Sequence, residues 1–170
     1  MQPAMKLQQV TLTRIVTFIL VAYAAQLFDL TPKISPWAAD VSGPTFAEMH
    51  RATDFYMSKR MPVFVQSFML FNLLFLGLTW RNRRSLSFRL VAVALLLQLV
   101  ITIIAIKTNV SMNAGMNAWD PAHLPDNWEV IRSRWLGAHN RNFYVNMAIS
   151  ILVFLGCYFH WIRSEYRPNP

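Results

Sequence analysis

The sequence predicts an all-α integral membrane protein, a four-helix up-down bundle with additional helical segments in the two long outer connections. The first observation is composition: 55% of the 170 residues are hydrophobic and only 14% are charged, whereas about a quarter of a soluble domain is charged. The second is that four apolar stretches approach the roughly 20 residues that a membrane-crossing helix needs. At this length we expect one domain, residues 1–170.

We place the four spans at about residues 10–28, 63–80, 88–106 and 142–161. A cleaved signal peptide competes with the first span, because Ala22-Tyr23-Ala24 resembles a cleavage site. We favour a retained helix, since the apolar run continues to Phe28 beyond that site. Pro62 precedes the second span, and we expect it to kink the helix that enters the span rather than end it.

The two long connections carry helix signals of their own. Thr45 and Glu48 form a capping-box pattern that predicts a helix start before the second span. Residues 107–125 contain Gly115 and Pro121, so we expect them to depart from an ordinary helix. Asp126 with Glu129 then predicts the start of a helix that enters the fourth span and ends near residue 161.

Net charge narrows the class of protein and its orientation. The formal charge of +8 comes with no Gly-rich or Arg-rich arm, so we exclude nucleic acid as a partner. Bases crowd the two termini and the short loop between spans two and three, which predicts that both termini are cytoplasmic. We therefore expect an integral protein of a bacterial inner membrane, surrounded by the lipid bilayer. The bases of that face are Lys6, Arg14, Arg81, Arg83, Arg84, Arg89, Arg163 and Arg167.

Polar groups recur at helical spacing along the last predicted helix. Asn142 and Asn146 lie deep enough in the membrane region that they should face inward, where polar groups find partners. Amides on the other spans are available to meet them, either as simple helix-to-helix bonds or around a polar cavity. The stripe consists of Trp128, Arg132, Trp135, His139, Asn142 and Asn146, and the amides are Gln26, Gln66, Asn72 and Gln98.

Two histidines stand where an outer connection enters a span. His50 shares a helix face with Asp54, and His139 lies beside Arg134 and Arg141. Such a pair fits metal or haem ligation, acid–base chemistry or polar capping, and the residues alone do not choose among these. His123, between two prolines, is expected to be exposed.

A His-bearing helix precedes span two, N-V-S-M-N ends at Asn113, and R-W-x-x-x-H-x-R runs from Arg134 to Arg141. With these motifs the chain resembles the anthrone-oxygenase-like family of small four-helix integral membrane proteins. The similarity covers most of the chain from Phe28 onward. The resemblance implies oxidation of a polycyclic aromatic or other hydrophobic small molecule by dioxygen, with no metal or other cofactor.

The resemblance also implies roles for the matching residues. A base, an oxyanion-stabilising group and an apolar slot are needed to remove an acidic C–H next to a carbonyl and two aryl rings. We expect His139 or His50 to be the base, and Arg134 or Arg141, together with Asn113, to stabilise the oxyanion. The residues expected to bind substrate are Trp128, Trp135, Phe143, Asp54 and Asn142.

Two other classes stay open. In one, His50 and His139 bind haem or copper in a membrane redox protein. In the other, the protein is not an enzyme but binds a lipid or quinone, or serves as an accessory subunit of a membrane complex. A homo-oligomer is also compatible with the sequence.

Overall fold

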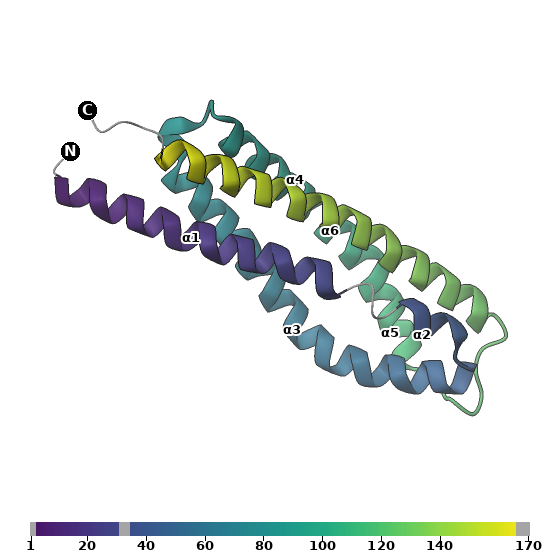
Figure 1. Cartoon of the computed structure of the whole chain (residues 1–170). Helices are drawn as coiled ribbons and strands as arrows, with labels where there is room; N and C mark the ends of the chain where they lie inside the picture. The colour runs from purple at the N-terminus through teal and green to yellow at the C-terminus, as the bar shows by residue number, and fades with distance from the viewer. Residues whose placement is uncertain (1–2, 31–34, 166–170) are drawn as a thin grey trace.

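The computed structural model describes residues 3–30 and 35–165, and these residues are almost entirely helical. The long helices α1 (Pro3–Leu30), α3 (Gly43–Leu78), α4 (Leu86–Ala105) and α6 (Trp128–Glu165) lie alongside one another (Figure 1). Within the described ranges the only β pairing is an isolated bridge between Asp120 and His123. The prediction of an all-α fold is confirmed. Pro32 and Arg167, which belong to the predicted connection and tail, lie outside the described residues.

Within residues 3–30 and 35–165, three helical stretches are long and apolar enough to cross a membrane: Gly43–Leu78, Leu86–Asn117 and Trp128–Ile162. In α1 the apolar stretch is shorter, Val10–Gln26. The outward faces of these helices are also apolar, with Leu74, Leu96 and Ile103 among many exposed aliphatic side chains. Exposed apolar surface of this extent is a mark of contact with lipid or another protein. The chain is a helical membrane protein by these criteria.

Helix α3 begins differently from the prediction. Its N-cap is Ser42 and Pro44 occupies the first turn, where a missing backbone N–H has no cost. The Ser42 hydroxyl lies 2.9 Å from the Thr45 hydroxyl. The capping box of Thr45 and Glu48 is therefore wrong as the helix start, because the N-cap, Ser42, lies three residues before Thr45. The helix continues through Pro62, as predicted, and Figure 1 shows that α3 bends along its length.

The third predicted span does not end at residue 106. Helix α4 continues through a π-helical turn, η2 (Ile106–Val110), into α5 (Ser111–Asn117). The prediction that residues 107–125 depart from an ordinary helix is confirmed at the π-turn and after Asn117, where α5 ends. It is wrong for Gly115, which lies within α5 on an open helix face, because a Cβ placed there would meet nothing within 4 Å. A π-turn accommodates an extra residue within a helix and is frequent at functional sites.

The bundle core lies between α1, α3, α4 and α6. The close approach of α4 and α6 depends on Gly156, where an added Cβ would lie 2.7 Å from Val91 Cγ2. Contact this close leaves no room for a side chain, so the glycine sets the spacing of the two helices. The buried residues of this core are Val16, Leu20, Ala24, Phe68, Phe75, Val91, Ala94, Ile101, Ile149, Val153 and Cys157.

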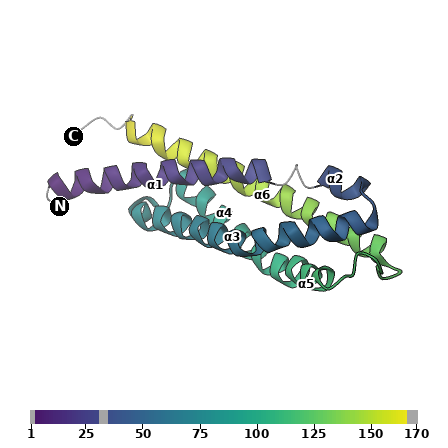
Figure 2. The same cartoon turned by 90° about the horizontal axis from the view of Figure 1, so that it is seen from below.

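Different elements lie at the two ends of the molecule, and one end has a small core of its own. The start of α1, the end of α6 and the turn η1 (Trp80–Asn82) lie at one end, whereas α2 (Ser35–Asp40) and α5 lie at the other (Figures 1 and 2). At the second end a smaller core forms from Ala38, Phe46, Met116 and Trp135. This smaller core is the setting of the candidate site.

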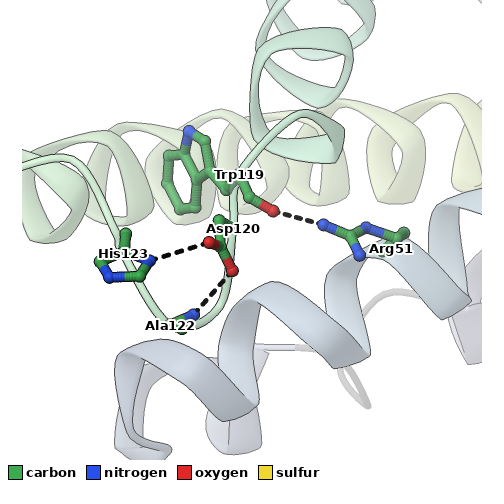
Figure 3. A network of polar contacts seen from close by, with 5 residues as sticks. All are labelled: Arg51, Trp119, Asp120, Ala122 and His123. Atoms are coloured by element: carbon green, nitrogen blue, oxygen red, sulfur yellow. Dashed lines mark hydrogen bonds and ion pairs between the residues drawn. The ribbon is translucent and has the colours of Figure 1, made fainter.

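Polar contacts hold the connection between α5 and α6 (Figure 3). His123 Nδ1 lies 2.9 Å from Asp120 Oδ2, and the Ala122 backbone N–H donates to Asp120 Oδ1 at 3.0 Å. Arg51 reaches across from α3 to donate to the Trp119 carbonyl. The hydrogen bond from His123, with that from Ala122, lowers the pKa of Asp120. The His123 side chain is 85% exposed, as expected from the sequence.

Candidate functional site

The structure brings His50 of α3 and His139 of α6 together at one tryptophan. Trp135 is buried, and its ring lies 5.5 Å from the His50 ring and 4.2 Å from the His139 ring, measured between centroids. His50 is only 3% exposed, and both imidazole rings contact the Trp135 ring. Two imidazoles from helices far apart in sequence therefore share one buried location.

Asn113 of α5 connects this location to a carboxylate. Its Nδ2 donates to Asp54 Oδ1 at 2.7 Å, and its Oδ1 accepts from Trp135 Nε1 at 2.8 Å. The same oxygen lies 3.3 Å from His50 Nε2. A carboxylate oxygen accepts and an indole N–H only donates, so both neighbours fix the same orientation of the amide.

The orientation of Asn113 decides the tautomer of His50. Because the amide oxygen is an acceptor, His50 Nε2 must carry the proton that it donates. In the neutral ring the lone pair then lies on Nδ1. His50 Nδ1 is buried and has no hydrogen-bond partner among the described residues, and the same is true of His139 Nε2.

Such unpartnered nitrogens are costly to keep. An unsatisfied buried polar group destabilises a fold by about 1–3 kcal/mol, and native structures contain few of them. Among the described residues, two such atoms are imidazole nitrogens of one cluster, and Asn117 Oδ1 and Asn142 Oδ1 of the neighbouring amides are two more.

A second set of amides extends the network. Asn117 Nδ2 donates to Asp54 Oδ2 at 2.6 Å, and Asn142 Nδ2 donates to Asn109 Oδ1 at 3.2 Å. Asn142 thus pairs with η2, whereas Asn72 donates to the Phe68 carbonyl of its own helix. Of the other amides expected near it, Gln26 and Gln66 are exposed and Gln98 is buried.

Several predicted site residues lie elsewhere. The Cζ atom of Arg132 lies 4.6 Å from the centroid of the Trp128 ring. Phe143 packs on Tyr144, with ring centroids 5.5 Å apart. Trp135 is the expected aromatic wall whose ring lies against both His50 and His139. The second wall is Phe46, 5.9 Å from the His50 ring and 5.7 Å from Trp135. Its spacing of four from His50 was a signal that sequence reasoning missed.

Arg134 and Arg141 are exposed and line an open groove between η2–α5 and α6. A cavity of about 420 Å³ is lined by Lys107, Thr108, Ser111, Met112, Arg134, Gly137, Ala138 and Arg141. A second cavity of about 260 Å³ is lined by Ser111, Met112, Gly115, Met116, Trp119, Ile131 and Arg134. The shared residues make the two cavities neighbours, and the second overlies the smaller core that contains Trp135.

The described residues contain no group of three or more His, Cys, Asp or Glu side chains placed to hold a metal ion. The described residues form a helical membrane protein in which two imidazoles, of His50 and His139, lie at one place. The Asn113 amide and the Asp54 carboxylate orient the His50 ring. Comparison with protein-family models, curated proteins and solved structures finds no match.

Proposed function

We propose that the protein is a membrane-embedded oxygenase of the anthrone-oxygenase-like type, which oxidises a hydrophobic polycyclic aromatic with dioxygen. In this proposal α1 crosses the membrane with the other long helices in an up-down bundle, and both termini are cytoplasmic. The observation that carries the proposal is the buried, unpartnered Nδ1 of His50, whose tautomer Asn113 fixes.

His50 is the base in this proposal. Its Nδ1 takes a proton from a CH₂ group that stands next to two aryl rings and opposite a ring carbonyl, and the electron pair moves onto the carbonyl oxygen. Asp54 acts through Asn113 as a positioning residue, because its carboxylate holds the amide that accepts from His50 Nε2. A base placed in this manner contributes about 10²–10⁴-fold to a rate.

His139 supplies the second imidazole. Its unpartnered Nε2, in the protonated tautomer, donates a hydrogen bond to the oxygen on which charge develops. Neutral imidazole serves as such a donor in other enzymes. Phe46 and Trp135 provide apolar walls for the rings. We give Arg134 and Arg141 no part in this reaction, since they line the separate groove.

The proposed reaction balances without an external reductant. The carbanion carbon forms a bond to dioxygen, and a returning proton gives a hydroperoxide. The hydroperoxide then loses the remaining C–H proton and its O–O bond breaks, which leaves a carbonyl and releases water. The sum is CH₂ plus O₂ to C=O plus H₂O, in which the substrate carbon supplies all the electrons.

Access to the imidazoles is proposed from the smaller cavity. Met112 and Met116 line it, and Met116 packs in the same core as Trp135. Methionine side chains are flexible and adapt to irregular ligands. Their movement would connect the cavity with the face of Trp135 that the histidines contact.

Oxygen consumption by purified protein with an anthrone tests the proposal. We expect His50→Gln, which keeps a donor to Asn113, to lower the rate by about 10²-fold or more. His123→Gln, at an exposed position, is the matched control and should keep the rate. Equal rates for wild type and His50→Gln in correctly inserted protein would overturn the proposal.

A second candidate is a haem- or copper-binding redox protein. The two unpartnered nitrogens, His50 Nδ1 and His139 Nε2, favour it, because neutral imidazole is a common metal ligand. An absorption spectrum and metal analysis of protein purified from metal-supplemented cells separate the two candidates. Stoichiometric metal or a haem band that His50→Gln removes supports this second function.

A further inference from the structure

The larger cavity gathers three cationic side chains. Lys107 extends from the π-turn, and Arg134 and Arg141 extend from α6, so that all three line one groove. No carboxylate lines it, and within the described residues none of the three has an ion pair. Three like charges around one cavity repel one another, which favours a bound anion that neutralises them.

The position of these cations relates them to the membrane. Lys107 follows the apolar part of α4, and Arg141 directly precedes the apolar part of α6. In the proposed membrane arrangement, both residues lie where the apolar parts of α4 and α6 would meet the lipid headgroups. This is the end of the molecule opposite η1 and the cluster of Arg81, Arg83 and Arg84.

The remaining lining suits a phosphate group. Ser111 places a hydroxyl donor beside the cations, whereas the Thr108 hydroxyl is engaged with the Ile104 carbonyl and with Asn109 Oδ1. Guanidinium groups bind phosphate oxygens through paired N–H donors. Two of the residues that line the groove, Gly137 and Ala138, have little or no side chain, and a Cβ added at Gly137 would meet nothing within 4 Å. The groove is open enough to admit a headgroup.

We propose that this groove binds the phosphate of an anionic membrane lipid, with its acyl chains running down the apolar faces of α4 and α6. The site is separate from the paired imidazoles, so it stands whether or not the proposed oxidation is correct. A lipid is favoured over a soluble anion because Lys107 and Arg141 lie directly at the ends of apolar helix segments.

Native mass spectrometry of the full chain in a neutral detergent tests the site. Equal amounts of dioleoylphosphatidylglycerol and dioleoylphosphatidylcholine compete for the protein. Each cation near the surface contributes about fivefold to binding of an anionic lipid, so the wild type should prefer phosphatidylglycerol by roughly tenfold or more. Lys107→Gln and Arg141→Gln should each lower that preference by about fivefold.

Two matched controls isolate the groove. Gly137→Leu fills it without removing charge and should also reduce the preference, whereas Gly77→Leu, at an equally open glycine of α3, should not. Arg83→Gln with Arg84→Gln removes two charges at the other end and should change the preference less than twofold. An unchanged preference in the Lys107, Arg141 and Gly137 variants would overturn the proposal. Displacement of phosphatidylglycerol by excess inorganic phosphate would also overturn it, in favour of a soluble anion.

Discussion

Replacing Asn113 by leucine tests the hydrogen-bonded network at its centre. Leucine has a similar volume but no polar atom, so Asp54 loses one donor, while Trp135 Nε1 and His50 Nε2 lose their acceptor. Each buried neutral group left without its hydrogen bond costs about 1–3 kcal/mol, and the loss of a hydrogen bond to a charged group costs about 1.5–3 kcal/mol. Asp54 keeps Asn117, and Asn113 is half-buried. We therefore expect a net destabilisation of about 2–4 kcal/mol.

The assay is reversible unfolding in detergent, followed by tryptophan fluorescence. Ala114→Leu is the control, because it introduces the same side chain at an exposed neighbouring position of α5. In a Trp135→Phe background the indole donor is already absent, so Asn113→Leu should then cost about 1 kcal/mol less. A cost for Asn113→Leu within about 0.5 kcal/mol of that for Ala114→Leu would refute the assigned network.

Three further predictions follow from other parts of the structure. Gly156→Leu should destabilise the protein by about 1–3 kcal/mol through overpacking against Val91, whereas Gly77→Leu should be nearly neutral; thermal unfolding measures both, and equal effects would contradict the packing of α4 on α6. Nitrogen NMR of labelled protein should find the His50 proton on Nε2, and a proton on Nδ1 would show that Asn113 is oriented the other way. The contribution of Asp120 to loop stability is present above its unfolded pKa and is lost as pH falls through its lowered folded pKa. Amide exchange at Ala122 should therefore become less protected in acid relative to Ala114, and constant protection would argue against that bond.

Much of the fold followed from hydrophobic periodicity and length. The all-α class and the helices that carry His50 and His139 were predictable because long apolar runs leave few alternatives. The continuation of α4 through η2 into α5 was not, because Gly115 signals a break whose cost is only about 1 kcal/mol. A cost of that size is easily outweighed by packing.

The site was predicted in part. His50, Asp54, Asn113, Trp135 and His139 were named from the sequence, and the structure brings them together. The resemblance assigned Arg134 and Arg141 to the same site. Neighbours on a helix point about 100° apart, so Arg134 faces the groove while Trp135 is buried.

The spacing of Asn109 and Asn117 around Asn113 could have predicted that they belong to the same polar network. They lie four residues on either side of Asn113, and this spacing places all three on one helix face. The face became evident only once residues 107–117 were known to be helical.

Deuterium incorporation into an anthrone in heavy water, without oxygen, tests the role of His50 most directly. It reports removal of the C–H proton alone, before any step that involves dioxygen. We expect wild-type protein to accelerate the exchange and His50→Gln to lose about 10²-fold or more of that acceleration. Equal acceleration by both proteins would contradict the assignment of His50 as the base.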